Sequence, residues 1–272
     1  MIKQFIGYLT GEVLYKIFVL TIFYILVNEL SKEEYALYGI ILANIAVFSM
    51  FVRFAQNAVI SRYYFDNEKD YNEILGVSIV IFVATSVLFI ISSLFLFNAY
   101  ESFLSSIAPN LEKYPLILFL IIGISIFSFF HEITLSYTNV QKKVLLHNTL
   151  KLAQIIVTLV IVLLLINLTN TSLLLSYLIG WFFSYALNTI FSIYYLLKNR
   201  SISFSTKYLK EIVKFSAPLF VHSLSLLTII HINKFLLKEY STVEAIAEIT
   251  FIINISVIIE SLVMIFNRMW LP

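Results

Sequence analysis

Seven ionisable side chains interrupt long apolar stretches of this sequence, and they mark where chemistry could occur. A charged group inside a membrane-spanning segment costs roughly 2.5–3.5 kcal/mol on insertion scales, so each one needs a reason to be there. Basic groups at such depth could neutralise an anionic ligand, and acidic or histidine groups could hold a coupling ion. The residues are Glu12, Lys16, Arg53, Glu132, His231, Lys234 and Glu260.

Lys16, Arg53 and Lys234 are the candidate ligand-binding residues among them. Glu12 and Lys16 are four positions apart, so they lie one above the other on a helix face. They either neutralise each other and pack against another span, or they give a cavity a cation with its counter-ion. Arg53 either extends to the cytoplasmic surface or faces a cavity. Lys234 either contacts a ligand or extends to the outer surface.

Glu12, Glu132, His231 and Glu260 are the candidates for a coupling-ion or cavity role. Glu260 has no neighbouring charge in its apolar run, so it is either protonated or paired across helices. His231 has the alternative of being a hydrogen-bonded packing residue. The sequence has no cysteine and no clustered catalytic set, so we predict no catalytic residue, no metal site and no cofactor.

The elements that must position these side chains are apolar helices. Hydrophobic residues make up 60% of the 272 positions and charged residues 12%, which is too apolar for a soluble domain. The apolar residues form long runs without the alternation that a membrane barrel needs. We therefore predict an all-α integral membrane protein of about eight transmembrane helices, near 5–27, 36–58, 74–97, 115–137, 150–168, 172–197, 217–237 and 248–267. The net charge of +2 gives no basic stripe for nucleic acid.

Lysine and arginine concentrate on alternate connections between these spans, which predicts the orientation. The odd-numbered connections hold few cations, so we predict that the even-numbered connections and the N-terminus face the cytoplasm. The predicted location of the protein is the inner membrane. In the connection 198–216, Tyr208, Ile212 and Phe215 recur at helical spacing among lysines, which predicts an amphipathic helix on the membrane surface. The cations of the even connections are Arg62, Lys69, Lys142, Lys143, Lys151, Lys198, Arg200, Lys207, Lys210 and Lys214.

The same polar pattern starts two of the predicted helices. Ser31 precedes Glu34 by three residues, and Ser241 precedes Glu244 likewise, so each pair fits a capping box. The unit of span, capped outer turn and span therefore occurs twice. Either this is chance, or the last two spans begin a second copy of the first two, as in transporters with internal repeats.

The chain resembles the polysaccharide (O-antigen, Wzx-type) flippases of the multidrug/oligosaccharidyl-lipid/polysaccharide exporter superfamily. The resemblance is carried by "ELSKEEYALYG" at 29–39, "RFAQNAVISRYYFDNE" at 53–68, "KEIVKFSAPLFVHSLS" at 210–225 and "INKFLLKEYSTVEAIAEI" at 232–249. It implies a six-helix lobe at 1–197, a cytoplasmic amphipathic connector at 198–216, and the first two helices of a second, incomplete lobe at 217–272. A C-terminally truncated chain is therefore expected.

The resemblance implies a transporter and not an enzyme. It would flip or export a lipid-linked, polyprenyl-pyrophosphate oligosaccharide across the cytoplasmic membrane for lipopolysaccharide or other surface polysaccharide. The alternatives are a multidrug exporter of the same superfamily and a membrane enzyme of polysaccharide assembly. The expected partners are the lipid-linked oligosaccharide and the membrane, with a polysaccharide polymerase, glycosyltransferases, a second copy or a missing half as further candidates.

Overall fold

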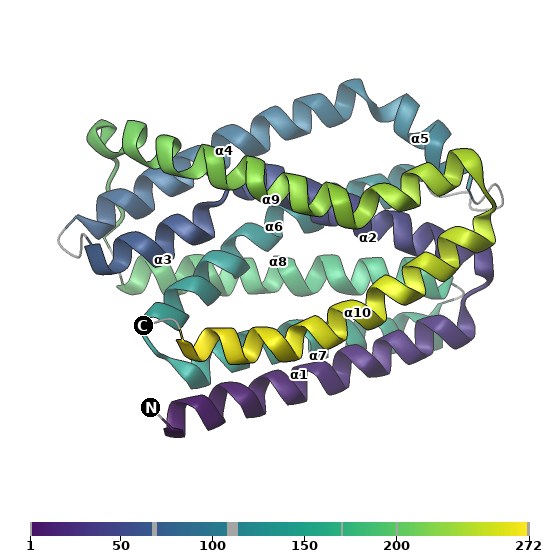
Figure 1. Cartoon of the computed structure of the whole chain (residues 1–272), viewed down its shortest axis with the longest axis horizontal. Coiled ribbons are helices and arrows are strands. Elements are labelled where there is room, and N and C mark those ends of the chain that lie inside the picture. Colours follow the sequence, from purple (N-terminus) through teal and green to yellow (C-terminus); the bar gives the residue numbers. More distant parts are fainter. Residues whose placement is uncertain (1, 67–69, 108–113, 170, 200, 271–272) are drawn as a thin grey trace.

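The computed structural model describes residues 2–66, 70–107, 114–169, 171–199 and 201–270. The side chains of residues 2–5, 66, 199, 258 and 260–270 lie outside this description. The long helices lie side by side, with turns gathered at two opposite ends (Figure 1). In the described part these helices are α1 (Ile2–Glu29), α2 (Lys32–Arg53), α3 (Gln56–Asp66), α4 (Tyr71–Phe95), α5 (Phe97–Ser105), α6 (Tyr114–Val140), α7 (Val144–Leu168), α8 (Leu173–Asn199), α9 (Thr206–Tyr240) and α10 (Val243–Trp270).

The predicted class, an all-α integral membrane protein, is confirmed. Within the described residues, seven helices are long and apolar enough to cross a membrane, namely α1, α2, α4, α6, α7, α8 and α9. The eighth predicted span falls in α10, part of which lies outside the side-chain description. Large apolar side chains such as Leu94, Phe95 and Ile190 project outward, where lipid would meet them.

The second predicted span, 36–58, is broken in the structure. Phe54 and Ala55 both take the left-handed conformation, with φ of 44° and 56°, and α3 starts immediately after them. Side chains satisfy the carbonyls freed by this break: the Thr85 hydroxyl donates to the Val52 carbonyl at 2.8 Å, and the Gln56 amide donates to the Phe54 carbonyl at 3.1 Å. Positive φ is costly for residues with a Cβ, so the surrounding packing must impose this bend.

The two predicted capping boxes differ in outcome. At the start of α2 the box is present: the Glu34 amide donates to the Ser31 hydroxyl at 3.2 Å, and the Ser31 amide donates to the Glu34 carboxylate at 3.1 Å. The box predicted at Ser241 is wrong. α10 begins one residue later, and the Thr242 hydroxyl accepts from the Ala245 amide at 3.3 Å. A hydroxyl residue thus caps both helices, Ser31 for α2 and Thr242 for α10. The second cap lies one residue after Ser241, the position that an exact repeat would use.

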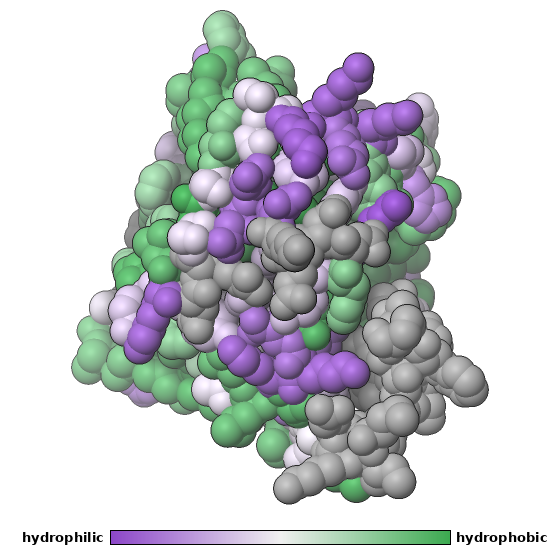
Figure 2. Space-filling view, turned by 90° about the vertical axis from the view of Figure 1, so that its left-hand side faces the viewer, coloured by the Kyte–Doolittle hydropathy of each residue, from purple (hydrophilic) through white to green (hydrophobic). Residues whose placement is uncertain are grey.

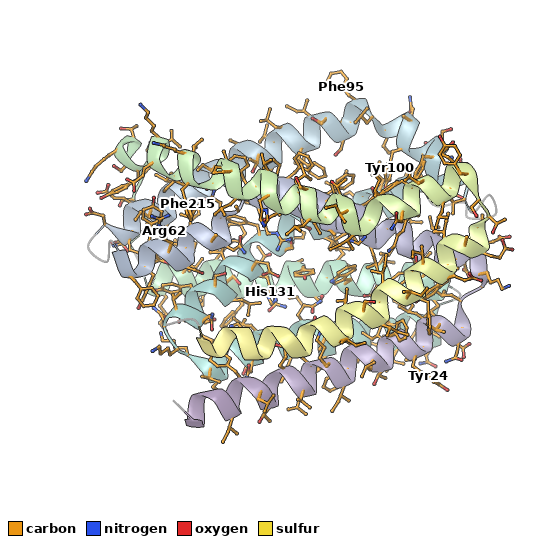
Figure 3. The ribbon with its side chains drawn as sticks, viewed as in Figure 1. Tyr24, Arg62, Phe95, Tyr100, His131 and Phe215 are labelled. Atoms are coloured by element: carbon orange, nitrogen blue, oxygen red, sulfur yellow. The ribbon has the colours of Figure 1, made fainter. Side chains whose placement is uncertain are left out.

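The predicted connector helix joins the seventh span in one 35-residue helix, α9, which continues through Pro218. Tyr208 and Ile212 are buried against α3 and α4, so the apolar face packs within the chain. The Arg62 guanidinium lies 4.5 Å from the ring centroid of Phe215 and tightens the same contact (Figure 3). Hydrophilic side chains gather over this end of the molecule (Figure 2).

Small polar residues hold the core together between α7 and α8. Ser184 is fully buried, and its hydroxyl accepts from the Thr158 hydroxyl at 2.9 Å. A Cβ on Gly180 would lie 2.8 Å from the Thr158 carbonyl, so glycine permits the close approach of the two backbones. These contacts fix α7 against α8, and α7 in turn carries part of the site described next.

Candidate functional site

Polar side chains from five helices lie near one another within the apolar bundle. Two ion pairs form the framework of this group, and two tyrosines lie between them. The charged members come from helices that are far apart in the sequence, so only the packing of the bundle brings them together. We call this group the central polar cluster; it consists of Glu12, Tyr15, Lys16, Arg53, Glu132, Lys151 and Tyr185.

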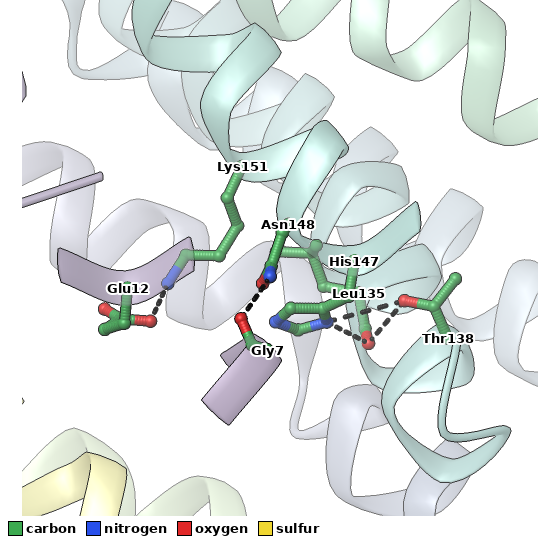
Figure 4. A network of polar contacts seen from close by, with 7 residues as sticks. All are labelled: Gly7, Glu12, Leu135, Thr138, His147, Asn148 and Lys151. Carbon is green, nitrogen blue, oxygen red and sulfur yellow. Dashed lines mark hydrogen bonds and ion pairs between the residues drawn. The ribbon is translucent and has the colours of Figure 1, made fainter. Parts of the chain in front are cut away.

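The tighter ion pair joins α1 to α7. The Lys151 ammonium lies 2.6 Å from a carboxylate oxygen of Glu12, and the two side chains are only 14% and 10% exposed (Figure 4). The ammonium also lies 4.5 Å from the ring centroid of Tyr15, within the range of a cation–π contact. Lys16 follows on the same helix, with its ammonium 5.6 Å from that ring centroid. Glu12 therefore pairs across helices, with a partner that the spacing of Glu12 and Lys16 did not predict.

The looser ion pair joins α2 to α6. An Arg53 guanidinium nitrogen is 3.9 Å from a Glu132 carboxylate oxygen, beyond hydrogen-bond length, and the side chains are 24% and 35% exposed. The Nε of Arg53 donates to the Ser49 carbonyl at 3.1 Å, which holds the guanidinium beside the bend of the second span. Arg53 thus faces Glu132 inside the bundle.

Aromatic rings connect the two ion pairs. Tyr15 lies within electrostatic range of both Glu12 and Glu132, and Tyr185 within range of Glu132 and Arg53. The buried ring of His131 packs edge-on against Tyr185 with centroids 5.4 Å apart. Its position near the centre of the bundle is visible in Figure 3. The two ion pairs are therefore linked through these rings, and Lys16 joins them through its contact with Tyr15.

A second set of contacts, next to the tighter pair, serves packing. The Asn148 amide donates to the Gly7 carbonyl at 2.8 Å, and a Cβ on Gly11 would overlap the Asn148 side chain. One residue earlier, His147 is buried and its Nδ1 lies 3.2 Å from the Leu135 carbonyl (Figure 4). These bonds anchor α1 and α6 to α7 without using a charge.

The structure places Lys234 and His231 away from the cluster. Lys234 is 1% exposed, and its ammonium donates to the Gly39 carbonyl of α2 at 3.0 Å. Gly39 is 14 positions before Arg53 on the same helix, or about 21 Å along the axis. His231 is half-buried one turn before Lys234 on α9. The side chain of Glu260 lies outside the described residues.

Comparison with known proteins gives the family. The model for the polysaccharide biosynthesis protein family matches residues 1–272. The chain belongs to this family. No curated protein sequence matches the chain. A solved structure named "protein A" is similar, with a TM-score of 0.72 and 16% identity; the match covers 98% of this chain and 62% of that one. At this identity the likeness shows the fold, and the chain spans less than two thirds of that protein's length.

Three members of the cluster in this polysaccharide biosynthesis family protein are not among the site residues predicted from the sequence: Tyr15, Lys151 and Tyr185. The sequence predicts Lys151 at the cytoplasmic edge of a span that starts near residue 150, among the cations of an even connection. The helix instead starts at Val144, which places Lys151 about two turns inside it. In the described part of the chain, no three side chains of His, Cys, Asp or Glu lie close enough together to hold a metal ion.

Proposed function

We propose that this chain is a transporter that flips a lipid-linked, polyprenyl-pyrophosphate oligosaccharide across the cytoplasmic membrane for surface-polysaccharide assembly. The observation that carries the proposal is the central polar cluster, where cations from three helices lie within the apolar bundle of a polysaccharide biosynthesis family protein and Lys151 is only 14% exposed. A charge at that depth is expensive unless it serves a ligand or an ion pathway. We also propose that the N-terminus faces the cytoplasm. O antigen is one surface polysaccharide that such a transporter would serve.

The charge balance supports an anionic ligand. Lys16, Arg53 and Lys151 outnumber Glu12 and Glu132, so the cluster suits a pyrophosphate better than a cationic drug. This argues against the multidrug alternative.

The apolar outer surface of the bundle is compatible with a ligand that carries a lipid tail. Apolar side chains cover the outside of the bundle, so the polyprenyl chain can stay in lipid while the head group enters between the helices. Tyr15 and Tyr185 add aromatic faces beside the cations. Glu12, Glu132, His231 and Glu260 are proposed as coupling-ion or cavity groups, and Lys234 as a further contact for the anion. Movement of the head group would follow from rocking of one helical wall against the other.

The experiment tests Lys16, which belongs to the cluster and is partly exposed. Lys16→Arg keeps the charge, and Lys16→Gln removes it. We expect Lys16→Gln to lower export of lipid-linked oligosaccharide about tenfold, equivalent to ~1.4 kcal/mol, in a strain that lacks its own flippase, while Lys16→Arg stays close to the wild type. Lys210→Gln removes an exposed lysine on α9 and serves as the matched control. Equal export by all variants at equal membrane levels would contradict the proposal.

A further inference from the structure

The ion pair between Glu12 and Lys151 is more than packing between α1 and α7 requires. These helices already touch through Gly7 and Gly11, and the Asn148 amide bonds the Gly7 carbonyl at 2.8 Å. A buried ion pair adds little net stability, because removing two charges from water costs about as much as their attraction returns. The pair therefore calls for a role beyond holding the two helices together.

Lys151 is placed to receive an anion. Its ammonium lies between the Glu12 carboxylate, at 2.6 Å, and the Tyr15 ring, at 4.5 Å. The Tyr15 ring lies within electrostatic range of Glu132, which faces Arg53. An anionic group that reached Tyr15 would therefore meet the Lys151 ammonium directly, and on the other side the Glu132 carboxylate, whose charge Arg53 offsets. A phosphate carries more charge than a carboxylate and offers more acceptor oxygens, so it can compete with Glu12 for the ammonium.

We propose that Lys151 binds the phosphate group of the transported lipid, and that Glu12 occupies Lys151 when no anion is bound. This inference rests on the proposed function and adds to it an exchange of partners at Lys151. When phosphate takes Lys151, the Glu12 carboxylate turns to Lys16, which is four residues along the same helix face. The charge of Glu12 thus stays compensated in both states. Without a bound anion, Glu12 neutralises the charge of Lys151. An incoming phosphate must therefore displace the Glu12 carboxylate from the ammonium.

The exchange makes a prediction that packing alone does not. Glu12→Gln removes the internal competitor while keeping the size of the side chain, so an anion should bind tighter. We expect the dissociation constant for farnesyl pyrophosphate to fall at least ~tenfold, measured by calorimetric titration of the purified chain in lipid nanodiscs. Each tenfold change corresponds to ~1.4 kcal/mol of competition removed. If Glu12 were only a structural partner, its loss would leave this constant unchanged or raise it.

Further variants locate the effect at Lys151. Lys151→Met should weaken binding at least ~tenfold, and adding Glu12→Gln to it should bring no gain, because the two residues act as one unit. Lys151→Arg keeps the charge and should keep most of the affinity. Asn148→Leu is the matched control, since it cuts the neighbouring bond between α1 and α7 without changing any charge. Its dissociation constant should stay within about twofold of the wild type.

The outcomes separate the two proposals. A wild type that does not bind farnesyl pyrophosphate would refute the proposed function. A wild type that binds it, with no tighter binding by Glu12→Gln, would refute the exchange and leave the function standing. Tighter binding by both Glu12→Gln and Asn148→Leu would also refute the exchange, because loosening α1 would then explain the gain. Should Lys151→Met not fold, the comparison of Glu12→Gln with Asn148→Leu still decides.

Discussion

Replacement of Lys234 by methionine should make the protein more stable and less active. Lys234 is 1% exposed, and the Gly39 carbonyl accepts from its ammonium at 3.0 Å. Within the described residues no carboxylate forms an ion pair with it. A lysine that is buried in a membrane span without a counter-ion is under-compensated, and residues kept at such a cost tend to serve function.

The magnitude follows from two opposing terms. Placing a lysine within a membrane span costs about 2.5–3.5 kcal/mol, and a hydrogen bond from a charged donor returns about 1.5–3 kcal/mol. The difference favours Lys234→Met by about 1 kcal/mol, because methionine is unbranched and fills nearly the same space. Lys234→Ala should instead lose stability, since emptying a buried site of that size costs about 2–5 kcal/mol.

The assay is unfolding in detergent micelles, followed for the wild type, Lys234→Met and Lys234→Ala, with export measured in parallel. We expect the order of stability to be methionine, wild type, alanine, and export to fall in both variants. A methionine variant less stable than the wild type by more than ~1 kcal/mol would refute the reasoning, because the ammonium would then be well compensated. Normal export by a stabilised methionine variant would refute the role of Lys234 as a contact for the anion.

Three more predictions test the cap, the helix crossing and the topology. Ser31→Ala should cost about 1 kcal/mol of stability because it removes the capping hydroxyl of α2, whereas Ser241→Ala should cost little in the same unfolding measurement. Gly39→Ala should destabilise by about 1–3 kcal/mol, since its Cβ would overlap the side chain of the facing helix α10. The chain has no native cysteine, so single cysteines at Ser106 and Lys210 can report the sides of the membrane. Impermeant maleimide should label Ser106→Cys and spare Lys210→Cys in intact cells; the reverse pattern would overturn the predicted orientation.

Much of the fold could be predicted from the sequence, because each segment that crosses the membrane must satisfy its own backbone hydrogen bonds. A run of apolar residues long enough to cross the bilayer satisfies its backbone only as a helix, so the all-α class and the approximate positions of most spans follow from hydropathy. The cap at Ser31 was predictable for the same reason, since its partners lie within three residues.

Only the tertiary structure decided which distant groups meet. Glu12 pairs with Lys151, 139 residues later, because α1 packs on α7, and no local pattern encodes that contact. The bend at Phe54 and Ala55 depends on side chains from other helices that satisfy the freed carbonyls. Likewise, Lys234 could have reached the surface, yet the packing of α9 on α2 directs its ammonium to a carbonyl. Hydropathy adds up along the chain, whereas the partner of a buried charge depends on how helices dock, which is a property of the whole bundle.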